Sequence, residues 1–157
     1  MLRMLENVDF SGYNTLLLDR DGVINVHRPN DYVKCWDEFQ FAEGFLDFIS
    51  KYSCQFDHVF VVTNQRCVGK GIVTKEALHE IHAKMVAEIE KVGGRIDKIY
   101  CCTAISDLDY RRKPNTGLFD DILHDWPNIE QKKCIMVGDM ESDMLFAKRC
   151  GIKGVLV

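Results

Sequence analysis

The sequence contains no apolar run near the ~20 residues that are needed to span a lipid bilayer. Its first ten residues include Arg3, Glu6 and Asp9 and contain no sustained apolar stretch, so they do not resemble a signal peptide. We therefore expect a cytoplasmic protein with no membrane partner.

Basic residues are not in excess either, because 20 Lys and Arg stand against 24 Asp and Glu and give a net charge of -4. A nucleic-acid-binding domain is expected to be basic, so we expect no nucleic-acid partner. The 7 cysteines are odd in number and form no Cys-x-x-Cys pair, which argues against a disulfide framework. Because repeats, low-complexity tracts and linkers are also absent, we expect one domain over residues 1–157, acting as a monomer.

Short apolar runs alternate with amphipathic segments along the chain. Strands are predicted over 15–18, 58–62, 96–102, 134–137 and 154–157, and helices over 44–52, 74–92, 117–125 and 141–150. This alternation predicts an α/β fold, with a parallel sheet and helices on both of its faces. We expect residues 1–14 to be a weakly structured leader, 20–43 a long connection and 67–71 a glycine-bearing loop.

Polar clusters follow three of the predicted strands. They are Asp19 and Asp21, Thr63 and Asn64, and Gly138 and Asp139. A basic triplet at 111–113 follows the third predicted strand, 96–102, through a loop. Because ligands of open parallel sheets bind beyond the carboxyl ends of the strands, we expect these four clusters to meet at one edge.

The clusters carry the groups that phosphoryl transfer needs. The candidate ligands for one Mg²⁺, a cation that prefers oxygen, are Asp19, Asp21 and Asp139. The candidate donors and positive charge for a phosphoryl group are Thr63, Asn64 and Lys113. Asp19 could attack phosphorus as a carboxylate, and Asp21 could serve as general acid and base. For the first cluster taken alone, the alternative is a solvated turn.

Four segments in this order resemble the motifs of the haloacid dehalogenase (HAD) superfamily. They are Asp-Arg-Asp-Gly-Val at 19–23, Thr-Asn-Gln at 63–65, Arg-Lys-Pro at 112–114 and Gly-Asp-Met-Glu-Ser-Asp at 138–143. Residues 18–25, 39–44 and 151–157 are similar to one branch, which contains D-glycero-D-manno-heptose 1,7-bisphosphate 7-phosphatases and histidinol-phosphatases. The resemblance implies a Rossmann-like HAD fold, and the spacing of the first two motifs leaves no room for a large cap domain.

The resemblance also implies residue roles. Asp19 would be the nucleophile and Asp21 the acid and base, while Mg²⁺ would bind Asp19, the backbone carbonyl of Asp21 and Asp139. Thr63 and Lys113 would hold the transferring phosphoryl group, as catalytic residues. The expected substrate-binding residues are Asn64, Gln65, Arg112 and Tyr32. We expect Asp143 to orient the metal site without binding the ion, and a plain position on the helix surface is the alternative.

The sequence departs from this branch in the loop before Arg-Lys-Pro, where many members bind a structural zinc. Only Cys101 matches a ligand position, and the other positions fall at Thr103, Asp109 and Arg111. We therefore expect no zinc, and a loop held by hydrogen bonds and packing. His79 and His82 lie three apart on a predicted helix, and we expect them on its surface.

The preferred function is hydrolysis of a small phosphorylated substrate, a heptose 1,7-bisphosphate, at its 7-phosphate. Histidinol-phosphate is a rival substrate within the same chemistry. A phosphate-binding module without catalysis on the same fold is the alternative from another class, and the intact pair Asp19 and Asp21 argues against it.

Overall fold

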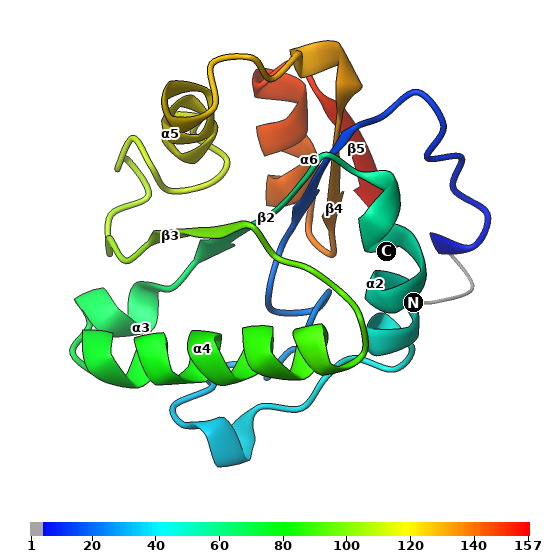
Figure 1. Cartoon of the computed structure of the whole chain (residues 1–157). Helices are drawn as coiled ribbons and strands as arrows, with labels where there is room; N and C mark the ends of the chain where they lie inside the picture. Colours follow the sequence, from blue (N-terminus) through cyan, green and yellow to red (C-terminus); the bar gives the residue numbers. More distant parts are fainter. Residues whose placement is uncertain (1–4) are drawn as a thin grey trace.

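A computed structural model describes residues 5–157, and its centre is one parallel sheet (Figure 1). The strands are β1 (Thr15–Leu18), β2 (His58–Asn64), β3 (Lys98–Cys102), β4 (Cys134–Gly138) and β5 (Lys153–Leu156). Their order across the sheet is β3-β2-β1-β4-β5, and each neighbouring pair is parallel. β1 is therefore central, and the chain order reverses on either side of it. The carboxyl ends of β2 and β4 flank the residue that follows β1.

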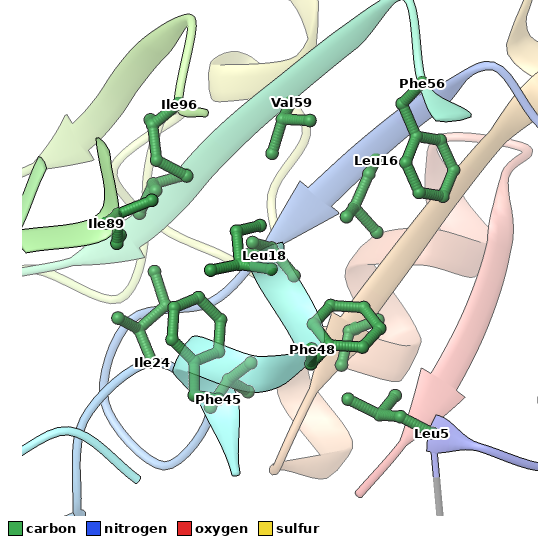
Figure 2. Packing of buried hydrophobic residues seen from close by; sticks show 14 of the residues in the cluster. Leu5, Leu16, Leu18, Ile24, Phe45, Phe48, Phe56, Val59, Ile89 and Ile96 are labelled. Atoms are coloured by element: carbon green, nitrogen blue, oxygen red, sulfur yellow. The ribbon is translucent and has the colours of Figure 1, made fainter. Parts of the chain in front are cut away.

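Helices cover both faces of the sheet, which confirms the predicted fold class. They are α2 (Phe45–Tyr52), α3 (Arg66–Gly69), α4 (Lys75–Lys91), α5 (Gly117–Asp125) and α6 (Glu141–Arg149). Because side chains alternate along a strand, Leu16 and Leu18 pack with α2 and α4, whereas Leu17 packs with α5 and α6. Figure 2 shows the first of these cores, where Phe45 and Phe48 of α2 lie against the strands.

The predicted leader is more ordered than expected. Leu5 and Phe10 are buried in the core that also contains α2, and the Phe10 ring contacts Phe48, Tyr52 and Phe56. Burial of this apolar surface fixes a segment that has little regular secondary structure of its own. The part of the predicted leader at residues 1–4 lies outside the described residues.

The other predicted elements agree with the structure to within one or two residues. β2 runs two residues further than predicted, through Thr63 and Asn64, because both pair with β3. The predicted loop at 67–71 is partly wrong, since the helical turn α3 occupies its first half. The connection at 20–43 contains a 3₁₀ turn, Trp36–Glu38, and an aromatic cluster, and within residues 20–43 there is no separate cap domain. In the described part of the chain, no helix is both long and apolar enough to cross a membrane.

Candidate active site

A buried lysine connects two carboxylates at the carboxyl edge of the sheet. Lys113 Nζ donates to Asp19 Oδ1 at 2.9 Å and to Asp143 Oδ1 at 2.7 Å. The side chains of Lys113 and Asp143 are each 2% exposed. The structure therefore brings the third-strand loop, the end of β1 and the start of α6 to one point, as the sequence predicted. The surface alternative for Asp143 is wrong.

A third carboxylate completes an acidic cluster. Asp19, Asp139 and Asp143 each offer an oxygen, and these three oxygens lie within 4.8 Å of one another. Asp139 Oδ1 is buried and has no hydrogen-bond partner among residues 5–157. Three carboxylates against one lysine leave an excess of about two negative charges, which a divalent cation with oxygen ligands would balance. The donor set therefore fits Mg²⁺.

Asp143 is less suited than its neighbours to bind an ion directly. Its Oδ1 accepts from Lys113, and its Oδ2 accepts from the backbone N–H of Met140 at 3.2 Å. That second bond satisfies a donor at the start of α6, where backbone N–H groups have no partner within the helix. Both carboxylate oxygens are thus already engaged, which suits a residue that orients Lys113.

Burial governs the protonation of the cluster. It raises the pKa of Asp19 to about 7, although the Lys113 charge opposes the shift. Burial and the charge of Asp143 also raise the pKa of Asp139. The pKa of Lys113 is raised, because the charges of Asp19 and Asp143 outweigh the opposing effect of burial. A divalent cation at this point would favour the charged carboxylates.

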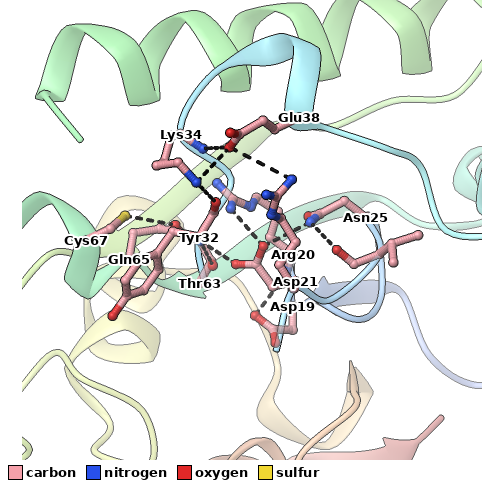
Figure 3. A network of polar contacts seen from close by, with 12 residues as sticks. Asp19, Arg20, Asp21, Asn25, Tyr32, Lys34, Glu38, Thr63, Gln65 and Cys67 are labelled. Atoms are coloured by element: carbon pink, nitrogen blue, oxygen red, sulfur yellow. Dashed lines mark hydrogen bonds and ion pairs between the residues drawn. The ribbon is translucent and has the colours of Figure 1, made fainter. Parts of the chain in front are cut away.

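Asp21 has a different environment, although only one residue separates it from Asp19 (Figure 3). Its Oδ1 accepts from Arg20 Nη2 at 2.8 Å and from Asn25 Nδ2 at 2.9 Å, and its Oδ2 accepts from Gln65 Nε2 at 2.7 Å. Burial acts to raise the pKa of Asp21, but the Arg20 charge and the three hydrogen bonds outweigh it and lower the pKa. Asp21 therefore rests as a carboxylate.

Arg20, which the sequence reasoning did not single out, links the site to α4. Its side chain is buried, and its Nη1 lies 3.2 Å from His82 Nε2. Because a guanidinium can only donate, His82 Nε2 must accept, and the imidazole is neutral. Burial, followed by the Arg20 charge, lowers the pKa of His82 to about 3. His82 is half-buried and His79 is exposed, so the prediction that both lie on the surface holds for His79 and only in part for His82, whose contact with Arg20 was not expected.

The polar residues at the end of β2 form hydrogen bonds that hold Lys113 and Gln65 in place. Asn64 clamps the backbone of Lys113, since its Nδ2 donates to the carbonyl and its Oδ1 accepts from the N–H, each at 3.0 Å. Thr63 is fully buried, and its Oγ1 accepts from Gln65 Nε2 at 2.9 Å. Gln65 thus joins Thr63 to Asp21.

Most of these groups open into a pocket of about 350 Å³, but Thr63 and Asp139 are not among its lining residues. Among the predicted site residues, Asp19, Asp21, Tyr32, Asn64, Gln65, Arg112, Lys113 and Asp143 line it. Sequence reasoning missed several further lining residues, of which Arg28 and Asp107 carry charge. They lie in loops that have no periodic pattern, so no signal in the sequence marks them.

Comparison with known proteins places the chain in a family. A family model described as "HAD-hyrolase-like" matches residues 110–157. A D-glycero-beta-D-manno-heptose-1,7-bisphosphate 7-phosphatase from Neisseria meningitidis is 36% identical over 143 residues, which cover 90% of this chain and 75% of that protein. The chain belongs to the HAD-like phosphatases.

Two more relatives support this HAD-like assignment. A D-glycero-alpha-D-manno-heptose-1,7-bisphosphate 7-phosphatase from Mycobacterium bovis is 35% identical over 133 residues, covering 84% of this chain and 70% of that protein. The crystal structure of the D,D-heptose 1,7-bisphosphate phosphatase from B. bronchiseptica with magnesium and phosphate superposes with a TM-score of 0.84. It is 30% identical, and the match covers 91% of this chain and 79% of that one. The predicted family is therefore confirmed.

The loop before Arg-Lys-Pro in this HAD-like chain is held by hydrogen bonds. Asn115 Nδ2 donates to the carbonyl of Asp107 at 3.2 Å and to that of Asp109 at 2.8 Å, and Asp109 Oδ1 accepts from the Arg111 N–H at 2.9 Å. Cys101 is half-buried. These contacts agree with the expectation that hydrogen bonds hold the loop. The absence of zinc stays a prediction.

Proposed function

We propose that the chain is a single-domain, Mg²⁺-dependent phosphatase that hydrolyses a small-molecule phosphate monoester through an aspartyl-phosphate intermediate. The observation that carries this proposal is the uncompensated charge around Asp19. Asp19 and Asp143 both pair with the buried Lys113, Asp139 lies beside them, and Asp139 Oδ1 has no hydrogen-bond partner within residues 5–157. A site of this charge is completed by a divalent cation together with the phosphate that it attracts.

We assign the metal to Asp19, Asp139 and the backbone carbonyl of Asp21. When bound, Mg²⁺ offsets the repulsion between the attacking carboxylate and the phosphate. Gly22 supports this assignment, because a Cβ there would lie 1.9 Å from Asp139 Oδ2. The first loop can therefore approach Asp139 only through a residue without a side chain.

We assign Asp19 as the nucleophile. Lys113 Nζ and the Arg20 backbone N–H both donate to its Oδ1, and these bonds fix the orientation of the carboxylate. Oδ2 then forms a bond to phosphorus as the bond from phosphorus to the substrate oxygen breaks. Lys113 Nζ and the Thr63 hydroxyl hold the phosphoryl oxygens, where charge develops during transfer.

Asp21 gives a proton to the departing alcohol oxygen and later takes one from the water that attacks the aspartyl-phosphate. Attack by water breaks the bond between Asp19 and phosphorus, so the carboxylate is restored and inorganic phosphate leaves. Asp21 rests with a lowered pKa. The negative charge of an arriving phosphate opposes that shift and favours the protonated form which the first step requires.

The substrate that we propose is a heptose 1,7-bisphosphate, cleaved at the 7-phosphate. The names of the relatives from N. meningitidis and M. bovis support this choice, and these names include both anomers. The pocket offers Tyr32, Gln65 and Arg112 to the body of such a substrate.

Phosphate release from heptose 1,7-bisphosphate, heptose 7-phosphate and histidinol-phosphate, with and without Mg²⁺, tests this proposal. We expect Mg²⁺-dependent release, preferentially from the bisphosphate, and a loss of about a thousandfold or more in Asp19→Asn. Asp57→Asn is the matched control, because Asp57 is exposed and precedes β2 at the opposite edge of the sheet. Activity that survives in Asp19→Asn would refute the assignment of the nucleophile.

A further inference from the structure

One carboxylate at the rim of the pocket lies between two arginines. Asp107 Oδ1 accepts from Arg112 Nε at 3.0 Å and also from Arg66 Nη2. The Asp107 side chain is 82% exposed, whereas those of Arg66 and Arg112 are 26% and 17% exposed. The two arginine side chains are thus mostly covered by protein, whereas the Asp107 carboxylate lies on their solvent side.

The two arginines carry more charge and more donors than Asp107 satisfies. Arg66 Nε and Arg112 Nη1 are buried and have no hydrogen-bond partner in the described part of the chain. The three side chains together keep about one positive charge. Hydrogen bonds from Arg112, followed by the charge of Arg66, lower the pKa of Asp107, so that it binds as an anion. Unfilled donors on paired guanidinium groups are typical of a site for a phosphate, which offers more acceptor oxygens than a carboxylate.

Position connects this site to the reacting centre. Asp107 and Arg112 line the same pocket as Asp19 and Lys113. Arg66 begins α3 directly after Gln65, which contacts Asp21. An elongated substrate with one phosphate at Asp19 can therefore extend within the pocket to Arg112 and Asp107, and Arg66 lies next to them through its contact with Asp107.

We propose that Arg66 and Arg112 form a subsite for a second phosphate, and that Asp107 occupies this subsite until such a substrate displaces it. The inference rests on the proposed phosphatase function and deepens it, because it names Arg66 and Asp107 as residues that set the preference for bisphosphates. Displacement of Asp107 is favoured because a phosphate carries more negative charge than a carboxylate. The exposed Asp107 side chain is then hydrated by solvent.

Steady-state hydrolysis of heptose 1,7-bisphosphate and of heptose 7-phosphate tests the subsite. In Arg66→Gln we expect the ratio of kcat/KM for the bisphosphate to that for the monophosphate to fall roughly tenfold. In Asp107→Asn we expect KM for the bisphosphate to fall roughly threefold at constant kcat, because the competing carboxylate has been removed. Arg66→Lys, which keeps the charge but loses the fork of donors, should lie between Arg66→Gln and the wild type.

The chain offers a matched control in the neighbouring pair Arg111 and Asp121, which is bidentate and lies outside the pocket. Arg111→Gln and Asp121→Asn should leave the ratio unchanged. The inference is overturned if Asp107→Asn loses activity on both substrates, since Asp107 would then be a clamp for the loop. An unchanged ratio in Arg66→Gln also overturns it. Absence of Mg²⁺-dependent release from every phosphate ester in the wild type would instead defeat the proposed function.

Discussion

Two ionic networks each contribute residues to the same pocket and have a similar arrangement of charges, yet they differ in burial. We define the floor as Asp19, Lys113, Asp139 and Asp143, and the wall as Arg28, Asp31, Lys34 and Glu38. In each, one lysine bridges two carboxylates, since Lys113 contacts Asp19 and Asp143 while Lys34 contacts Asp31 at 3.0 Å and Glu38 at 3.2 Å. The Lys113 side chain is 2% exposed and that of Lys34 is 37% exposed.

The difference between the two networks lies in charge balance as well as in solvent. The wall has two cations and two anions and is complete by itself, whereas the floor keeps an excess of about two negative charges. Water and salt screen the wall, so its ion pairs contribute little to stability. The floor lies where the effective dielectric constant is low, so its imbalance has a large effect and calls for a ligand. Equal contact geometry therefore does not mean equal function.

Removing the bridging lysine from each network gives the largest expected difference. Lys113→Met leaves the carboxylates of Asp19 and Asp143 buried without their cation. We expect it to cost about 3–5 kcal/mol of unfolding free energy at pH 7 and to lower phosphate release about a hundredfold or more. Urea unfolding and phosphate release measure the two effects.

Lys34→Met is the matched variant in the wall. We expect little change in either measurement, because solvent already shares the charges of Asp31 and Glu38. Equal losses in the two variants would contradict the distinction between floor and wall. A loss in Lys113→Met that shrinks below pH 6 would support it, since protonated carboxylates no longer need the lysine.

Alanine substitutions at two glycines distinguish the effect of backbone strain from the effect of displacing a floor residue. Gly22 and Gly71 both have positive φ, at 88° and 72°, so alanine strains the backbone at either position. At Gly22 the new Cβ also meets Asp139, whereas at Gly71 nothing lies within 4 Å. We expect both variants to lose about 1 kcal/mol or more from strain, but only Gly22→Ala to lose activity roughly tenfold or more.

Thermal unfolding with and without Mg²⁺ checks this prediction. The stabilisation that Mg²⁺ gives should shrink in Gly22→Ala and persist in Gly71→Ala, because only the first variant moves a proposed metal ligand. If Mg²⁺ stabilises both variants equally, Asp139 does not bind the ion.

The floor could be predicted from sequence because it depends on strand ends. Asp19 and Asp139 each follow an apolar run, and parallel pairing puts the carboxyl ends of these runs at one edge. Lys113 was harder to place, since a loop carries it, but its position before Pro114 fixed it near a helix start. The parallel topology was therefore enough to predict the positions of most floor residues.

The contact between Arg66 and Asp107 and the contact between Arg20 and His82 could not be predicted in this way. Arg66 and Asp107 meet through loops whose paths depend on tertiary packing. The contact of His82 with Arg20 was not predicted, because it joins positions 62 residues apart. Charged residues in loops and on helices have no period that indicates their partners.

The effect at His82, which contacts Arg20 from α4, is the smallest at pH 7, because it develops only as pH falls. The folded pKa is about 3 and the ordinary value is 6.5, so the unfolded chain binds a proton first as pH falls. Stability from the neutral imidazole is thus full above pH 6.5 and is lost toward pH 3, at up to about 1.4 kcal/mol per pH unit. His82→Gln keeps an acceptor for Arg20 and should flatten the wild-type curve between pH 6.5 and 4.5. His124→Gln, at an exposed position on α5, controls for loss of a histidine. Parallel curves for His82→Gln and the wild type would mean that His82 also binds its proton when folded, and that Arg20 is held without it.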